Sequence, residues 1–185
     1  QALARALNAE VRDLAVAGCR YIQVDEPVFA RKPELALDYG IENLERVFHG
    51  IPDYVQRVVH MCCGYPNALD VTNYLKADPQ AYFQIADAMD EAAVDAVSIE
   101  DAHRHNDLKL LEHYKSTTVL LGVIAIARSQ VEAVDEIKGR LEQALNHIDR
   151  HRLVAAPDCG LGMLGRELAC KKLTQLCTAA GCVHP

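Results

Sequence analysis

Apolar positions along the chain recur with two different periods. Leu3, Leu7, Val11 and Leu14 are spaced as on one face of a helix, whereas 21–24 is a β-branched and aromatic run typical of a strand. Strand and helix patterns then alternate about five times, and the strands are nearly continuously apolar. Parallel sheets covered by helices have this character, so the pattern predicts an α/β fold with a parallel sheet.

The remaining elements follow from the same two periods and from their end signals. Asp78 and Pro79 predict a helix start, Ser129–Glu132 fits a capping box that opens another helix, and Gly18, Gly50 and Gly181 are expected just beyond helix ends. The other predicted strands are 58–62, 96–99, 119–124 and 153–156. The other predicted helices are 41–48, 79–89, 108–114, one from about 129 to 148, and 166–180.

The length and the net charge of the chain limit the kinds of function that it can have. The 185 residues suit one domain over 1–185, and half of them are apolar. The net charge of −7 and the absence of a lysine or arginine run argue against nucleic acid or an anionic membrane as partner. No apolar run approaches the roughly 18–20 residues of a membrane span.

The seven cysteines bear on the cellular compartment. An odd count without a secretion signal argues against a disulfide framework and favours a reducing, cytoplasmic setting. Cys170 and Cys177 lie seven apart on the last predicted helix and are expected to be buried small hydrophobic residues. Cys63 should point away from its neighbour Cys62 and belong to the core.

Metal-ligating side chains stand where the predicted strands end. His60 and Cys62 are two positions apart and so point to the same side of a strand, and imidazole with thiolate suits Zn²⁺. Asp25, Glu100 and Cys159 stand at other strand ends. Because the carboxyl ends of parallel strands share one face, His60, Cys62, Glu100 and Cys159 can converge as a tetrahedral N, S, O, S zinc site.

These residues also carry a family resemblance. The segments 22–27 (IQVDEP), 60–62 (HMC), 98–100 (SIE) and 157–161 (PDCGL) occur in the order and at spacing compatible with one family. Together they resemble the C-terminal catalytic barrel of cobalamin-independent methionine synthase and its relatives. The resemblance covers most of the chain, and its specificity comes from the combination of motifs.

The resemblance implies a TIM (β/α)8-type parallel barrel with zinc at His60, Cys62, Glu100 and Cys159. It also implies that Asp25 helps to hold the amino group of homocysteine, which accepts a methyl group from 5-methyltetrahydrofolate to form methionine. A thiol on zinc is deprotonated at neutral pH and can attack a methyl or alkyl carbon. Glu100, the hardest donor, is expected to exchange most easily when the substrate thiol arrives.

Two departures from the family pattern change these expectations. A full barrel needs eight strands, whereas about five are predicted here, so this chain should form the last five β/α units of a partial barrel. Its open edge would expose apolar surface. We therefore expect a fragment of a longer chain, or a homo-oligomer that covers the edge.

The second departure concerns the proton donor. The family places a histidine after the strand that contains Gly122, and this sequence has Ala127 there. His103 or His105, which follow Glu100, are candidates to replace it. The change leaves open alkyl transfer to another small thiol, as in epoxyalkane:coenzyme M transferase. A catalytically incomplete zinc-binding barrel is the third alternative.

Overall fold

A computed structural model describes residues 1–183, and its centre is a parallel sheet of five strands in the order β1-β2-β3-β4-β5. The strands are β1 Tyr21–Asp25, β2 Gln56–Met61, β3 Ala96–Ile99, β4 Thr118–Ile124 and β5 Leu153–Pro157. The α-helices are α1 Ala2–Val16, α2 Pro33–Leu35, α3 Ile41–Phe48, α4 Ala81–Glu91, α5 Val134–Ala144 and α6 Arg166–Gly181. Shorter helical turns are η1 Phe29–Arg31, η2 Ala36–Gly40, η3 Leu108–His113 and η4 Arg150–Arg152.

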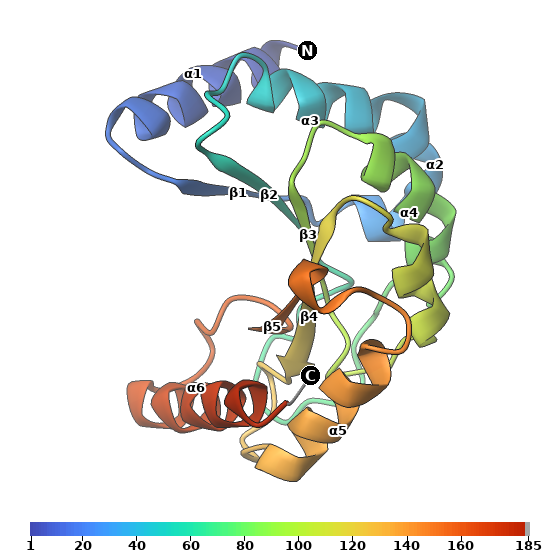
Figure 1. Ribbon diagram of the computed structural model, residues 1–185, viewed down its shortest axis with the longest axis vertical. Coiled ribbons are helices and arrows are strands. Elements are labelled where there is room, and N and C mark those ends of the chain that lie inside the picture. Colours follow the sequence, from blue (N-terminus) through green and yellow to red (C-terminus); the bar gives the residue numbers. More distant parts are fainter. Residues whose placement is uncertain (184–185) are drawn as a thin grey trace.

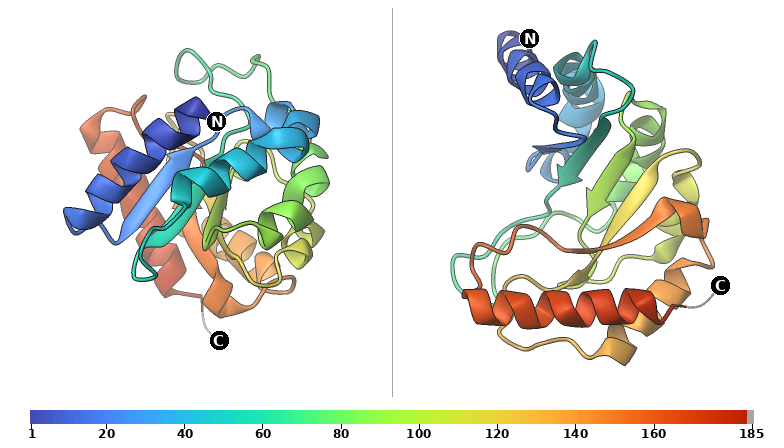
Figure 2. Two further views of the ribbon diagram at one scale, coloured as in Figure 1. Left: turned by 90° about the horizontal axis from the view of Figure 1, so that it is seen from above. Right: turned by 60° about the vertical axis from the view of Figure 1, so that its left-hand side comes forward.

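The helices form an arc around the strands. In Figure 1 this arc begins with α1, passes through α3, α4 and α5, and ends with α6, and it is open on one side. The right-hand view of Figure 2 shows α1 and α6 at opposite ends of the arrangement. Each strand pairs in parallel with its sequence neighbour, as in the wall of a TIM-type barrel. The predicted fold, a partial barrel of five strands, is thus confirmed.

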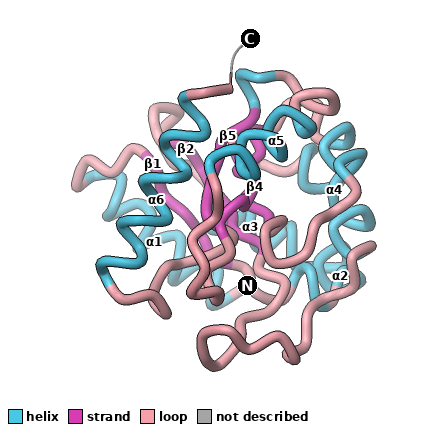
Figure 3. Tube along the Cα trace, turned by 90° about the horizontal axis from the view of Figure 1, so that it is seen from below, coloured by secondary structure: helices cyan, strands magenta, loops and turns pink. Residues whose placement is uncertain are grey.

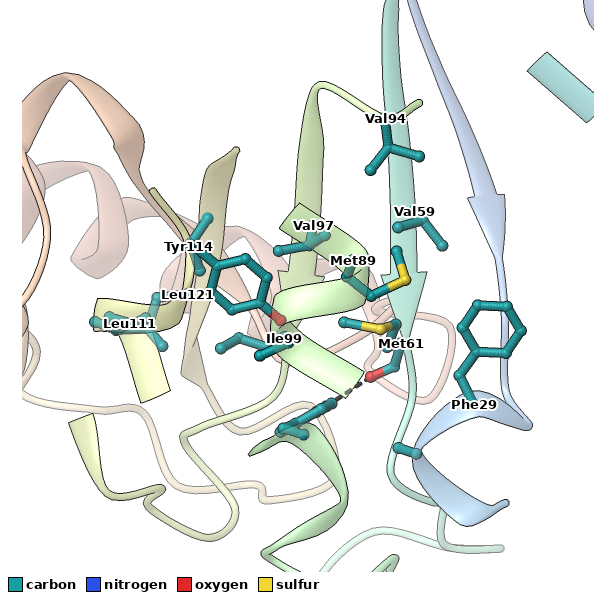
Figure 4. Close-up of a cluster of buried hydrophobic side chains, with 14 of the residues drawn as sticks. Phe29, Val59, Met61, Met89, Val94, Val97, Ile99, Leu111, Tyr114 and Leu121 are labelled. Carbon is teal, nitrogen blue, oxygen red and sulfur yellow. Dashed lines mark hydrogen bonds between the residues drawn. The ribbon is translucent and has the colours of Figure 1, made fainter. Parts of the chain in front are cut away.

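The core lies between the sheet and the helices. Alternate strand residues such as Val59, Met61, Val97 and Ile99 are buried there, since successive side chains point to opposite faces (Figure 4). Tyr82 of α4 extends from this core to the strand ends. Its hydroxyl donates to the carbonyl oxygen of Met61 at 2.6 Å and accepts from the backbone N–H of Glu100 at 3.2 Å, which ties the ends of β2 and β3 together.

The loops that follow the strands gather on one face. In Figure 3, which views the molecule from below, long loops lie in front of the strands. The functional residues predicted at strand ends belong to this face, as the parallel topology requires. Within residues 1–183, no helix is both long and apolar enough to cross a membrane.

The capping box predicted at Ser129–Glu132 is wrong. Helix α5 begins only at Val134, and Glu132 instead accepts hydrogen bonds from the Ala125 backbone N–H and from the buried ammonium of Lys172, each at 2.9 Å. A tertiary ion pair has overridden the local signal. A smaller shift affects α4, where Asp78 caps a turn and the helix begins at Ala81.

Two predictions of burial are also wrong. Cys170 and Cys177 are exposed, because α6 turns a different face inward, with Lys172, Leu176 and Ala179 buried. In α1, Val11 of the apolar stripe is buried together with Ala4 and Ala15, whereas Leu3 is 72 % exposed. Cys63, by contrast, is buried in the core as predicted.

Candidate metal centre

His60 occupies the end of β2, between β1 and β3. Its register partners are Asp25 on β1 and Ser98 on β3, and it is almost fully buried. The ring is fixed at both nitrogens: Nδ1 lies 2.9 Å from Oγ of Ser98, and Nε2 lies 3.2 Å from Sγ of Cys159. With Nδ1–H donating to Ser98, Nε2 keeps a lone pair directed at the thiols of the site.

Cys62 and Cys159 complete a group of three donor atoms. One donor atom each from His60, Cys62 and Cys159 lies within 4.8 Å of the other two. Cys62 is placed by a turn at Gly64, whose φ is +145°, and a Cβ at Gly64 would come 2.5 Å from the carbonyl oxygen of Leu75. One imidazole and two thiols at this separation could hold a metal ion.

The two thiols influence each other's ionisation. Their mutual hydrogen bond is the largest cause of a raised pKa at Cys62, which burial raises further, and of a lowered pKa at Cys159. Burial lowers the pKa of His60, but the bond to Cys62 and the nearby charges outweigh it, and the net shift is upward. Cys159 is therefore the thiol that ionises first, with Cys62 as its hydrogen-bond donor.

Glu100 lies at the end of β3 but is held by other partners. Its Oε1 accepts from the backbone N–H of Cys63 at 2.7 Å, and its Oε2 accepts from Nζ of Lys76 at 2.5 Å. It forms a second cluster with His103 and Asp158, again with one donor atom each within 4.8 Å. Its role as a metal ligand stays a prediction.

Asp25 stands at the exposed end of β1, next to His60 in register. Its Oδ1 accepts from Nε2 of Gln23 at 2.7 Å. The carboxylate is therefore open to solvent on the face that carries the thiols. Its predicted contact with a substrate amino group stays a prediction.

The two candidate proton donors differ in their surroundings. Nδ1 of His103 lies 2.7 Å from Oδ2 of Asp158, and Nε2 accepts from the backbone N–H of Ala127 at 3.2 Å. Both ring nitrogens of His103 are thus engaged within the protein. His105 is 61 % exposed, and its Nδ1 lies 3.3 Å from Oδ2 of Asp101. Their part in catalysis stays a prediction.

Asp158 and Lys76 were not singled out by sequence reasoning. Asp158 is fully buried and accepts from the backbone N–H groups of Asp101, Ala102 and His103 at 2.8 Å each. Asp158 thereby anchors the loop after β3, and it directly precedes Cys159 in the chain. The only signal for Asp158 was its place in the 157–161 motif, and Lys76 had none.

In sequence, the chain is similar to known proteins. The family model described as cobalamin-independent synthase, catalytic domain, matches residues 1–182. Methionine synthase of Pyrococcus abyssi is 29 % identical over 183 residues, which are 98 % of this chain and 48 % of that protein. Methionine synthase of Thermococcus kodakarensis is 29 % identical over 175 residues, which are 94 % of this chain and 46 % of that protein.

A solved structure gives the same relationship in three dimensions. A B12-independent methionine synthase from Shewanella sp. W3-18-1, in complex with selenomethionine, superposes with a TM-score of 0.89 at 29 % identity, over 98 % of this chain and 53 % of that chain. The chain spans about half the length of the curated relatives that it matches. On its sequence and its fold, the chain belongs to the family of the cobalamin-independent synthase catalytic domain.

Proposed function

We propose that the protein is a zinc-dependent methyltransferase that activates the thiol of homocysteine to accept a methyl group from 5-methyltetrahydrofolate, which forms methionine. Family membership and relatives named methionine synthase support the reaction class. The Shewanella relative was solved with selenomethionine, an analogue of the proposed product. One observation on this chain carries the proposal: His60, Cys62 and Cys159 converge at the ends of two strands.

This donor set fits zinc. Imidazole and thiolate are its preferred protein ligands, and three protein ligands leave a fourth position, as in catalytic zinc sites. Bound zinc would lower the pKa of a substrate thiol from its free value of about 8.5, so that the thiolate is present at neutral pH. Two cysteine ligands keep the bound sulfur electron-rich, whereas a three-histidine site favours activation of water.

The protein's own side chains prepare this chemistry. Ser98 holds the imidazole of His60 in one orientation. Mutation of a residue that orients a metal ligand in this way typically weakens metal binding about 10–100-fold. Glu100 is proposed as the fourth, most exchangeable ligand, and Lys76 lies in place to hold its carboxylate when it is not on the metal. Asp25 is proposed to bind the substrate amino group from the neighbouring strand end.

Zinc binding is the first test. The protein should retain one zinc ion after gel filtration, and Cys62→Ser and Cys159→Ser should each lose most of it. Cys170→Ser, which removes an exposed thiol on α6, is the matched control and should retain zinc like the parent. Stoichiometric zinc in both site variants would show that these cysteines are not ligands.

Activity is the second test. The zinc-loaded protein should transfer the methyl group of 5-methyltetrahydrofolate to homocysteine, and Asp25→Asn should raise the KM for homocysteine more than it lowers kcat. Zinc binding without transfer to any thiol would leave the third alternative, a catalytically incomplete zinc-binding barrel.

One observation favours an alternative alkyl donor. Ala127 stands where the family pattern has a histidine, and His103 beside it uses both ring nitrogens within the protein. A donor that needs no protonated leaving nitrogen suits this site, as in alkyl transfer to coenzyme M. Assays that pair homocysteine with 5-methyltetrahydrofolate, and coenzyme M with an epoxyalkane, separate the two functions.

The proposal extends to the protein's assembly and compartment. We propose that this chain forms the C-terminal portion of a catalytic barrel, and that further strands or a second copy cover its open side. Tyr21 on the edge strand β1 is 77 % exposed, which leaves apolar surface for such a partner. Ligand thiols need a reducing environment, so the cytoplasm is the proposed location.

A further inference from the structure

A cavity lies on the same face as the candidate metal centre. Its volume is about 470 Å³, and it is formed by the loops after β2, β3 and β4. Its walls include Tyr74 and Lys76 from the first loop, His103 and Arg104 from the second, and Arg128 from the third. The first and third loops are joined by the Asp70 backbone N–H, which donates to the carbonyl oxygen of Ala127 at 2.7 Å.

The positive charge of the cavity is only partly compensated, because Lys76 and His103 pair with Glu100 and Asp158 but its two arginines contact carbonyl oxygens. The guanidinium of Arg104 donates to the carbonyl oxygen of Ala77 at 2.7 Å, and that of Arg128 donates to the carbonyl oxygen of His103 at 3.1 Å. Neither arginine forms an ion pair with a carboxylate in the part of the chain that the structure describes. Asp70 is the one carboxylate of the lining, and its Oδ1 already accepts from the backbone N–H of Ser129.

A further donor in the same wall has no partner. The hydroxyl oxygen of Tyr74 is buried and makes no hydrogen bond within residues 1–183. The Tyr74 ring packs edge-on against His103, and Nζ of Lys76 lies 5.3 Å from the ring centroid. A buried O–H without an acceptor costs free energy, and a bound anion would supply that acceptor.

The cavity adjoins the candidate metal centre through Glu100. Two residues that line the cavity are close to Glu100. Nζ of Lys76 lies 2.5 Å from Oε2 of Glu100, and His103 belongs to the same group of donor atoms as Glu100. A small molecule could therefore place one end in the cavity and its reactive carbon near the thiols. The positive cavity contrasts with the chain's net charge of −7.

We propose that this cavity binds an oxyanion, a carboxylate or phosphate group, on the molecule that donates the methyl or alkyl group. Planar guanidinium groups match the geometry of both anions, and charge-assisted hydrogen bonds to them are about twice as strong as neutral ones. That the bound molecule is the alkyl donor rests on the proposed function. The anion site itself depends only on the residues of the cavity.

Calorimetric titration of the metal-free, 185-residue protein at low ionic strength tests the anion site without any thiol chemistry. The probes are inorganic phosphate and glutarate, with glutaramide as the uncharged analogue. Arg128→Gln should weaken binding of the preferred anion about fivefold or more, and Asp70→Asn should strengthen it, because the opposing charge is removed. Arg5→Gln on α1 changes the net charge equally at a distant exposed position and should change affinity less than twofold.

The outcomes identify the kind of anion that the cavity binds. They also test the anion site separately from the proposed zinc-dependent function. Preference for phosphate identifies a phosphoryl group, and preference for glutarate identifies a carboxylate. Failure of both anions to bind the parent protein, or equal losses in Arg128→Gln and Arg5→Gln, overturns the anion site. Because the measurement omits zinc and thiol, a failed zinc test on Cys62→Ser leaves this result unaffected.

Discussion

Gly122 of β4 allows Asp158 to approach the sheet closely. A Cβ atom on Gly122 would lie 2.3 Å from Oδ1 of Asp158 and 2.7 Å from its Cα atom. The register of β4 and β5 shifts between Gly122 and Ile124, directly beside this contact. Only glycine leaves room for the carboxylate that anchors the loop after β3, and Asp158 is followed in the chain by Cys159.

Gly122→Ala should therefore disturb both stability and metal binding. The added methyl group must displace Asp158, and overpacking of this kind typically costs about 1–3 kcal/mol in the free energy of unfolding. Urea unfolding and zinc content measure the two effects. Gly139→Ala in α5 is the control: its Cβ meets nothing within 4 Å, so alanine should raise stability by up to about 1 kcal/mol. Equal losses in both variants would contradict the role of Gly122.

The sheet and three of the site residues could be predicted because local patterns determine them. Continuous apolar runs predicted the strands, and the i, i+2 spacing of His60 and Cys62 placed both donors on one side of the chain. Cys159 followed from the rule that parallel strands end on one face. Each of these inferences needs only the order of residues along one strand and the topology.

Other features depend on contacts between distant residues, which a single sequence does not reveal. Asp158 reaches the loop at Asp101 from 57 positions away, and Lys76 reaches Glu100 from 24 positions away. The Ser129–Glu132 pattern failed for the same reason, since Lys172 claims the carboxylate of Glu132 from 40 positions away. Such pairings are decided by tertiary packing rather than by local propensity.

Lys76→Met should destabilise the protein through Glu100. The Glu100 side chain is only 5 % exposed, and it would lose the ammonium 2.5 Å away that balances its charge. Removal of one partner from a buried pair typically costs about 3–5 kcal/mol, and the 13 % exposure of Lys76 favours the lower end. Chemical denaturation measures the loss.

A surface pair supplies the matched control for that variant. Lys138→Met breaks the exposed pair with Glu142 on α5 and should cost less than about 1 kcal/mol. The double variant Lys76→Met, Glu100→Gln should recover part of the loss, because it removes the unpaired charge. No recovery in the double variant would mean that Lys76 acts through packing alone.

Asp95 should account for part of the stability that the protein loses on acidification. Its carboxylate accepts from Nε and Nη2 of Arg57 at 2.8 and 2.7 Å, and this bond is the largest cause of its lowered pKa. A lowered pKa contributes stability that is present above the unfolded value of about 3.9 and is lost as the pH falls through the folded value. Asp95→Asn should therefore cost about 1–2 kcal/mol at neutral pH and progressively less at acid pH.

Urea unfolding of both proteins between about pH 7 and pH 2 measures this convergence. Glu10→Gln on the exposed surface of α1 is the control and should follow the parent at every pH. A difference between Asp95→Asn and the parent that stays constant down to the lowest pH would show that the charge of Asp95 is not what stabilises the fold.

Thiol alkylation should divide the cysteines by their surroundings. Cys170 and Cys177 are exposed and should react first with iodoacetamide in the native, metal-free protein. Cys63 should react slowly, because it is 4 % exposed and burial is the main cause of the rise of its pKa to about 11, so little thiolate is present. Peptide mass spectrometry after timed quenching gives the rate for each cysteine.

Zinc should then protect a defined subset of these thiols. Added zinc should slow the labelling of Cys62 and Cys159 while the rate at Cys170 stays constant, because only the first two belong to the donor group with His60. In urea without zinc, all the cysteines should react at similar rates, which controls for differences in intrinsic reactivity. Rapid native labelling of Cys63, or zinc protection that includes Cys170, would contradict the placement of the thiols described above.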